Sequence, residues 1–286
     1  MIDSMSLGIV FKGAEGIVLA ADSRVTLYNQ KPSLIPNQTI SVPSYYDNAQ
    51  KLLYCNSQTH IGAVTYGLGA LGQKDFRTAH SLMLEFEDYL GAKGVTKKKR
   101  IKVQEYAKHL SDFFLDQWNT RMPPQQPNAK IDPMIFLVGG YNEGEIYGKI
   151  YQFSIPLSPV PTDCMADDTF GLQYGGQSDY LARLLRGFDN NLPIKVKEIL
   201  NINDAQKADL TTKLTASLSS PVPYQFFSLQ DCVDLSTFLI TTTIRLQLFL
   251  NDIRGVGGEI DVATITRAEG FQPVQVKQVH GNYYQI

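Results

Sequence analysis

Two short apolar runs near the N-terminus, joined by a glycine turn, constrain the fold of this chain more than any other feature. The runs cover residues 7–12 and 17–22, and the sequence Gly-Ala-Glu-Gly lies between them at residues 13–16. Apolar runs that flank a short glycine turn predict a β-hairpin. We therefore expect a hairpin whose open end carries the small hydroxyl residue Ser6 and the sequence Asp-Ser-Arg at residues 22–24.

Length and composition predict a globular protein. The chain has 286 residues, of which 43% are hydrophobic and 19% are charged, and this mixture can bury a sizeable core. The net charge of -2 argues against a dedicated nucleic-acid binder, which normally carries a basic surface. No run approaches the roughly 18 to 20 apolar residues that a membrane helix needs, and the N-terminus lacks the pattern of a secretory signal. We expect a cytoplasmic protein without a nucleic-acid or membrane partner.

The cysteines and histidines do not form a metal-binding pattern. Cys55, Cys164 and Cys232 are odd in number and far apart, so they predict neither a disulfide framework nor a zinc site. The 4 histidines show no ligand spacing. The sequence therefore predicts free, mostly buried thiols, no metal and no organic cofactor.

The predicted strands and helices are grouped by type along the chain. Further strands are expected at residues 51–55, 59–66, 133–140, 146–155, 169–174, 259–266 and 272–279. Helices are expected at residues 74–90, 103–122, 178–188, 204–217 and 229–253. This order differs from a βαβ repeat, and it predicts stacked sheets with helical layers.

Two segments are interpreted as insertions in a single domain that spans residues 1–286. Residues 28–48 contain three prolines with several Asn and Ser, which predicts a long loop. Residues 189–223 are polar. The basic run at residues 97–100 lies beside a helix start and is interpreted as a solvated face.

The N-terminal hairpin resembles the opening of proteasome β-subunits and their bacterial relatives. In that family a Thr begins the mature chain, the glycine of the first turn follows ten residues later, and an Asp that begins Asp-Ser-Arg follows after sixteen. Here Gly16 follows Ser6 by ten residues and Asp22 follows it by sixteen, without a gap. The resemblance extends over about residues 6–266, although a Ser stands where the family has Thr.

Later matches to the family fall in the same order along the chain. Lys51, in Gln-Lys-Leu-Leu, matches a lysine on the third strand, and Gly67 matches a glycine whose amide forms part of an oxyanion hole. Asp252 lies near the end of the last helix, and Ser178 follows a glycine pair. In the family, a serine directly precedes a late Gly-Gly pair. Here that pair is at residues 257–258, but the serine is missing, and the distance from Asp252 to the pair is one residue longer than in the family.

The resemblance implies a fold and a reaction. The fold is α+β, a four-layer αββα sandwich of two antiparallel sheets between helical layers. The reaction is that of an N-terminal-nucleophile hydrolase, in which Ser6 attacks an amide carbonyl and its own α-amine is the base. An unperturbed α-amine has a pKa of about 7.7 to 8.0, which suits that task.

The other site residues take supporting roles in this scheme. Lys51 favours the alkoxide by its positive charge, and Asp22 orients Lys51. The Gly67 amide stabilises the developing oxyanion. Asp252 and Ser178 orient the amine.

Each of these residues also has a purely structural explanation. Asp22 and Arg24 would form an ion pair at a strand end, and Lys51 would be a solvated charge at a strand edge. Ser178 would be a helix N-cap, and Asp252 a carboxylate at a helix end.

The mechanism requires that the nucleophile be the first residue. Translation from Met5 followed by removal of that methionine would expose Ser6, and so would autocatalytic cleavage of the Met5–Ser6 bond. Otherwise Ser6 is an ordinary strand residue. A different register of the first strand places Ser4 at the nucleophile position, with two extra residues in the turn.

Three functions follow from these readings. The first is a proteasome-like serine-type peptidase that cleaves peptides or unfolded proteins and assembles into a homo-oligomeric ring or barrel. The second is a catalytically silent, self-assembling scaffold subunit. The third is an amidase or acyl transferase that acts on a small amide or a specific peptide through the same nucleophile.

Overall fold

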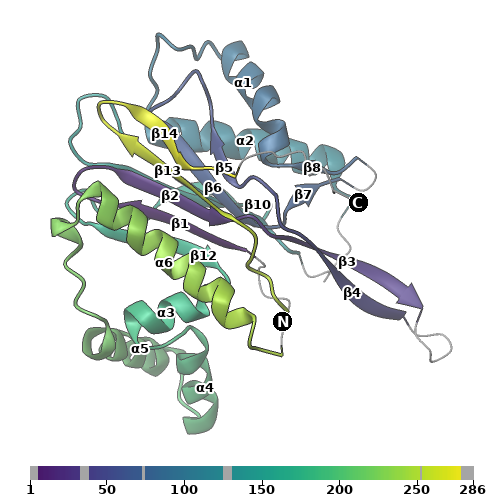
Figure 1. The fold of residues 1–286 in the computed structure, drawn as a ribbon, viewed down its shortest axis with the longest axis vertical. Helices are drawn as coiled ribbons and strands as arrows, with labels where there is room; N and C mark the ends of the chain where they lie inside the picture. The colour runs from purple at the N-terminus through teal and green to yellow at the C-terminus, as the bar shows by residue number, and fades with distance from the viewer. Residues whose placement is uncertain (1–5, 33–38, 73–74, 125–130, 252, 278–286) are drawn as a thin grey trace, which may run out of the picture.

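Two antiparallel sheets form the centre of the molecule (Figure 1). A computed structural model describes residues 6–32, 39–72, 75–124, 131–251 and 253–277. The first sheet contains β1 (Leu7–Lys12), β2 (Ile17–Asp22), β12 (Gly171–Gly176), β13 (Ile260–Thr266) and β14 (Gly270–Gln275), in the order β12-β1-β2-β13-β14. The second contains β5 (Leu52–Tyr54), β6 (Ile61–Gly67), β9 (Met134–Gly140), β10 (Lys149–Ile155) and β11 (Ser158–Asp163), in the order β11-β10-β9-β6-β5.

The predicted N-terminal hairpin is confirmed. Lys12 pairs with Ile17 across the turn, and the amide of Gly13 donates to the carbonyl of Gly16 over 2.9 Å. Every residue of β1 and β2 is buried because the first sheet is covered on both faces. Alternate residues divide between the two faces, so Val10 joins the core between the sheets and Phe11 joins the core under the helices.

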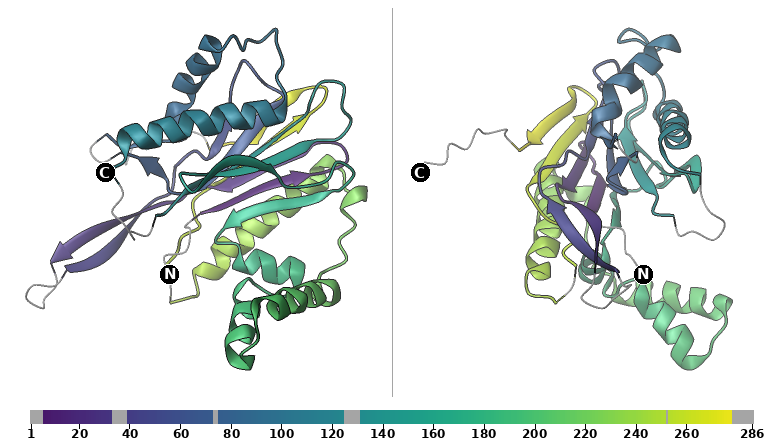
Figure 2. Two further views of the ribbon diagram at one scale, coloured as in Figure 1. Left: turned by 180° about the vertical axis from the view of Figure 1, so that it is seen from behind. Right: turned by 90° about the vertical axis from the view of Figure 1, so that its right-hand side faces the viewer.

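Helices cover the outer face of each sheet (Figure 2, left). The second sheet is covered by α1 (Met83–Ala92) and α2 (Val103–Arg121), and the first by α3 (Asp179–Arg186) and α6 (Leu229–Gln247). Two further helices, α4 (Asn191–Leu200) and α5 (Asp204–Leu218), pack on each other at the end of the molecule near α3. The coarse prediction of an α+β protein with antiparallel sheets and helices is confirmed.

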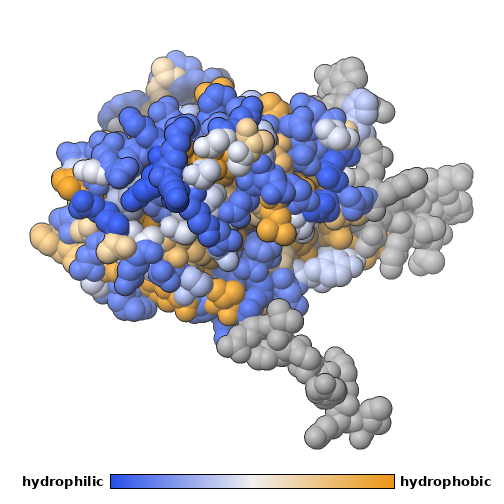
Figure 3. Space-filling view, turned by 90° about the horizontal axis from the view of Figure 1, so that it is seen from above, coloured by the Kyte–Doolittle hydropathy of each residue, from blue (hydrophilic) through white to orange (hydrophobic). Residues whose placement is uncertain are grey.

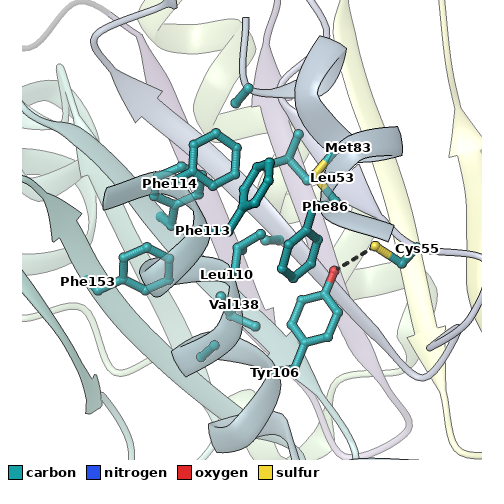
Figure 4. Close-up of a cluster of buried hydrophobic side chains, with 14 of the residues drawn as sticks. Leu53, Cys55, Met83, Phe86, Tyr106, Leu110, Phe113, Phe114, Val138 and Phe153 are labelled. Carbon is teal, nitrogen blue, oxygen red and sulfur yellow. Dashed lines mark hydrogen bonds between the residues drawn. The ribbon is translucent and has the colours of Figure 1, made fainter. Parts of the chain in front are cut away.

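Aromatic side chains of α2 fill the space between the helices and the second sheet (Figure 4). Phe114 lies 4.7 Å from Phe136 of β9 and 5.4 Å from Phe113, measured between ring centroids. The hydroxyl of Tyr106 donates to Cys55 Sγ over 3.4 Å. The apolar residues recur at the spacing of one helical face, which is why residues 103–121 form a helix against this sheet.

The predicted loop at residues 28–48 is wrong over the part that the structure describes. There β3 (Val25–Pro32) and β4 (Thr39–Tyr46) pair with each other and form a two-stranded ribbon, which we call the arm. The arm extends away from the sheets (Figure 1). Its prolines are compatible with strands because each strand of a two-stranded ribbon has a free edge that needs no amide donor.

Other differences from the prediction lie at the ends of helices. The helix expected at 74–90 begins only at Met83, after the short ribbon of β7 (Ala70–Leu71) and β8 (Arg77–Thr78) and the 3-10 turn His80–Leu82. The last long helix ends at Gln247 rather than at residue 253. The Gln247 side chain, at this end of the helix, accepts from the Val256 amide over 3.1 Å. A second 3-10 turn, Tyr224–Phe226, precedes α6.

The face of the molecule seen in Figure 3 is largely hydrophilic, with hydrophobic residues scattered over it. Within the described part of the chain, none of the helices combines the length and the apolar character that crossing a bilayer requires. Cys55, Cys164 and Cys232 are free thiols, and Cys164 is the one that is only half-buried.

Candidate functional site

Lys51 is the centre of a buried polar cluster between the open ends of the two sheets. It directly precedes β5, and its ammonium group donates to Ser6 Oγ over 2.7 Å and to Asp22 Oδ1 over 2.7 Å. A third bond of 2.6 Å goes to the carbonyl of Arg24. These three bonds use all three donors of a lysine. Only 6% of the Lys51 side chain is exposed, so it is not the solvated strand-edge charge of the structural reading.

Asp22, the last residue of β2, is fully satisfied by hydrogen bonds. Its Oδ1 accepts from Lys51 and from the amide of Leu7 over 2.9 Å. Its Oδ2 accepts from the amides of Arg24 over 3.1 Å and Gly257 over 3.0 Å. Four hydrogen bonds to its two oxygens hold this buried carboxylate in one orientation. The carboxylate accepts a hydrogen bond from the backbone amide of Arg24 and not from its guanidinium. The ion pair between Asp22 and Arg24 that the structural explanation expects therefore does not form.

Ser6 is held from both sides. It is 3% exposed, and its carbonyl accepts from the amide of Gln177 over 2.8 Å. Its φ of 136° lies in a region that favours glycine, so the backbone at Ser6 is strained. Gly176 lies against it with φ of 97°, and a Cβ there would come within 1.9 Å of the Ser6 carbonyl oxygen. A side chain at position 176 would therefore displace the Ser6 backbone.

A small cavity of about 10 Å³ lies beside Ser6. Lys51 and Gly67 line it together with Thr65 and Thr78. Gly67 ends β6 with φ of 88°, a conformation that residues with a side chain rarely adopt. The cavity has room for a group no larger than about one water molecule.

The predicted site residues thus have different outcomes. The structure brings Ser6, Asp22 and Lys51 into direct contact, and Gly67 shares their cavity. Ser178 begins α3 without a side-chain capping bond, and in the described part of the chain it makes no hydrogen bond to those three residues. Asp252 lies outside the described residues, as does the alternative nucleophile Ser4.

Burial and a neighbouring carboxylate act in opposite directions on the pKa of Lys51. Removal from water lowers the pKa of Lys51, and this effect is opposed by the neighbouring carboxylate of Asp22. Burial has the larger effect, so the pKa of Lys51 lies below the ordinary value of a lysine.

Sequence reasoning missed a second lysine, Lys277, whose charge acts on Lys51. Lys277 forms an ion pair with Asp261 and donates to Ser23 Oγ over 2.9 Å. Its charge also contributes to lowering the pKa of Lys51. Lys277 lies at the end of the described chain, and no spacing in the sequence connects it with Lys51.

The amide of Gly257 was missed as well. The sequence presents Gly257 only as part of the late Gly-Gly pair, whereas in the fold its amide donates to Asp22. Among the described residues, His, Cys, Asp and Glu side chains nowhere gather in a group of three or more that could hold a metal ion.

Comparisons with known proteins find a likeness of structure and not of sequence. No family model matches the chain, and no curated protein is a significant match. Among solved structures, the chain is similar to one described as the helical assembly of the Anbu complex from Pseudomonas aeruginosa. The TM-score is 0.51 at 13% sequence identity, over 97% of this chain and 88% of that chain.

These comparisons correct the family that the motifs indicated. The identification with proteasome β-subunits is wrong, because no family model matches and the likeness is to the Anbu complex. The correction has a physical reason: a strand pair and an Asp-Ser-Arg sequence comprise few residues, so they can fit a fold without identifying a family. At 13% identity over nearly the whole chain, the likeness establishes that the chain shares the fold of the subunits of the Anbu complex.

Proposed function

We propose that this protein is an N-terminal-nucleophile hydrolase of amide bonds, with Ser6 as the nucleophile. The observation that carries the proposal is the buried chain from Ser6 Oγ through Lys51 Nζ to Asp22, with 2.7 Å for each bond. A hydroxyl needs a nearby base and a positive charge to act as a nucleophile near neutral pH.

The reaction proceeds in two steps. Ser6 Oγ attacks the carbonyl carbon of an amide, and its proton passes to the free α-amine that Ser6 has as a terminal residue. That amine then protonates the departing nitrogen, and the carbon–nitrogen bond breaks to leave an ester on Ser6. Water hydrolyses the ester by the same proton transfers in reverse. Lys51 stabilises the alkoxide, and the Gly67 amide is the proposed oxyanion donor.

The four-layer αββα sandwich and the single domain are part of the proposal. Three separate hydrophobic clusters support the layers: one under α1 and α2, one between the sheets, and one under α3 and α6. Strands from both ends of the chain share the first sheet, which supports one domain over residues 1–286. The arm and the α4–α5 pair are then insertions in that domain.

The size of the cavity favours substrates with a small group on the acyl side. A space of about 10 Å³ beside Ser6 does not accept a large side chain without movement of the wall. This observation also favours the alternative function of an amidase or acyl transferase that acts on a small amide. Peptides or unfolded proteins with small residues at the cleavage site are the corresponding substrates of a peptidase.

We also propose that the protein assembles from copies of itself. The structure to which it is similar is described as a helical assembly. Light scattering on the purified protein separates a monomer from a ring, barrel or helix. If the protein assembles but remains inactive, it is the silent scaffold.

The decisive experiment compares the natively expressed protein with its Ser6→Ala variant. Intact mass gives the first residue, and a panel of fluorogenic peptides and small amides gives the rate. We expect a mature chain that begins at Ser6, with hydrolysis that Ser6→Ala abolishes. A mature chain that retains Met5 in the purified, folded protein would contradict the mechanism, and so would equal rates for the two proteins.

A further inference from the structure

We propose that Asp47, at the root of the arm, is a positioning residue for the Ser6 site and acts through Arg24. The inference rests on the proposed hydrolase function. It assigns a role to the segment between β2 and β5, which the sequence alone presents as an insertion. The segment contacts the site through Arg24. The backbone of Arg24 forms hydrogen bonds with the site, and its side chain pairs with Asp47.

The backbone of Arg24 belongs to the site itself. Its carbonyl accepts the third hydrogen bond of Lys51 Nζ over 2.6 Å. Its amide donates to Asp22 Oδ2 over 3.1 Å. The Lys51 ammonium is therefore aimed at Ser6 only while the Arg24 peptide keeps this orientation.

The side chain of Arg24 is held by the arm. Nε donates to Asp47 Oδ1 over 2.6 Å, and a terminal nitrogen donates to Asp47 Oδ2 over 2.7 Å. The guanidinium carbon also lies 4.8 Å from the ring centroid of Tyr45, near the end of β4. A two-pronged pair of this kind fixes the direction of the guanidinium as well as its distance. The arm therefore determines where the Arg24 side chain points.

The loop after α6 closes the same arrangement from the other side. A terminal nitrogen of Arg24 donates to the carbonyl of Arg254 over 3.0 Å. A Cβ on Gly257 would lie 2.4 Å from the guanidinium carbon, and a Cβ on Gly258 would lie 2.4 Å from the Asp47 carbonyl oxygen. The glycine pair lets the loop approach this closely, and the Gly257 amide reaches Asp22 from there.

The exposure of the pair separates positioning from stability. The Asp47 side chain is 42% exposed and that of Arg24 is 15% exposed. Half-exposed ion pairs contribute little to the stability of a fold, because water screens them. Neutralising Asp47 is therefore expected to change the orientation of the Lys51 ammonium group. The unfolding temperature is expected to change little.

The test uses the isosteric variant Asp47→Asn in the full-length protein, with Glu85→Gln as the matched control. Glu85 also forms an ion pair with an arginine, Arg77, and its side chain is 45% exposed. It lies on α1 and not at the Ser6 site. We expect Asp47→Asn to lower kcat by about tenfold with KM unchanged, since misaligned catalytic groups lose rate rather than affinity. We expect Glu85→Gln to match the wild type. Thermal unfolding is recorded for each variant to confirm that it folds.

A second readout does not depend on activity. The 15Nζ signal of Lys51, assigned by its loss in Lys51→Met, reports the hydrogen bonds of the ammonium group. We expect this signal to move in Asp47→Asn and to stay in place in Glu85→Gln. In an Arg24→Gln background, the further change Asp47→Asn is expected to have no effect on the signal, because the path through Arg24 is already broken.

The two readouts separate this inference from the proposed function. An unchanged Lys51 signal and unchanged kcat in Asp47→Asn would overturn the positioning role while wild-type hydrolysis stands. Equal effects of Asp47→Asn with and without Arg24 would also overturn it, since Asp47 would then act by charge alone. A shifted signal in a protein that hydrolyses nothing would support the positioning role and remove the proposed reaction.

Discussion

Ser6, Asp22 and Lys51 come from three separate segments, and each is surrounded by groups that leave it little freedom. Asp22 accepts four hydrogen bonds, and Lys51 donates three. A buried charge pair is costly unless such bonds satisfy it. Here the bonds satisfy both charges and hold the ammonium group in one orientation, as the proposed nucleophilic attack requires.

The contact between Gly176 and Ser6 gives a prediction at this scale. Gly176→Ala would place a Cβ within 1.9 Å of the Ser6 carbonyl oxygen, so Ser6 must move. We expect hydrolysis to fall by about 100-fold, because a displacement of about 1 Å has that effect on reacting groups. A fluorogenic peptide assay on the purified variant measures the loss.

Gly94→Ala is the control for the backbone conformation. Gly94 also has a positive φ, 75°, but a Cβ there meets nothing within 4 Å. That variant should lose about 1 kcal/mol of stability and retain full activity. Equal activities of the two alanine variants would show that the contact with Ser6 does not constrain the nucleophile.

The three thiols give a second prediction for single residues. Burial raises the pKa of Cys55 to about 12 and that of Cys164 to about 11. The pKa of Cys232 is also raised to about 12. Because the thiolate is the reactive form, the half-buried Cys164 should react first with a disulfide reagent at pH 8.

Labelling followed by peptide mass mapping checks this order. We expect label on Cys164 alone in the folded protein and on all three cysteines in denaturant. In Cys164→Ser the early labelling should disappear. Early label on Cys55 or Cys232 would mean that the cores around them open on the time scale of labelling.

At the scale of elements, the helices that cover a sheet face are positioned by that face. The aromatic face of α2 packs on β9 and β10, and this contact accounts for the 19-residue length over which the helix holds. The contrasting case is α5, which buries none of its residues. It begins with a capping box formed by Asn203 and Gln206, so local bonds replace tertiary packing at its N-terminus.

The packing of α2 predicts a large loss of stability for Phe114→Ala. Phe114 is fully buried between Phe113 and Phe136, so its removal leaves a cavity. We expect the free energy of unfolding to fall by about 3 to 5 kcal/mol. Phe238→Ala on α6 removes the same side chain at a position that is 55% exposed, and it should cost far less. Denaturant titration of both variants measures the difference, and similar midpoints would contradict this view of the core.

At the scale of the whole molecule, stability should depend on acid through the buried His60 and the half-buried His80. His60 precedes β6, and its Nε2 lies 3.0 Å from the carbonyl oxygen of Ile101, which ties the second sheet to the start of α2. Burial lowers the pKa of His60, and the pKa of His80 is lowered for the same reason. The folded state therefore disfavours the protonated rings.

This shift predicts the sign of the pH dependence. An unfolded histidine takes up its proton at about pH 6.5, and the folded protein resists that uptake. The unfolding free energy should thus be highest above about pH 6.5 and fall as the pH drops through and below that value. Unfolding measured from pH 8 to pH 5 tests this, and His60→Gln, which retains a donor, should flatten the curve. An identical slope in that variant would assign the acid sensitivity to other groups.

The sequence by itself determined the elements whose signals are local. The apolar runs around Gly-Ala-Glu-Gly were sufficient for the β1–β2 hairpin, and the periodic aromatics were sufficient for α2. The spacing of Ser6, Asp22 and Lys51 also led to the residues that the fold brings into contact, through a family assignment that the comparisons then corrected. The hairpin and the helix can be predicted because hairpin pairing and helical periodicity depend on residues that are close in the chain.

Only the tertiary structure decided how distant segments meet. Three contacts join segments whose sequences do not indicate that they meet. These are the pairing of β3 with β4, the ion pair of Lys277 with Asp261, and the ion pair of Asp47 with Arg24. Composition assigned the arm to a loop because proline and asparagine favour turns locally, whereas two free ribbon edges accept them. The orientation of a buried ammonium group depends on every donor and acceptor around it, and those come together only when the sheets pack.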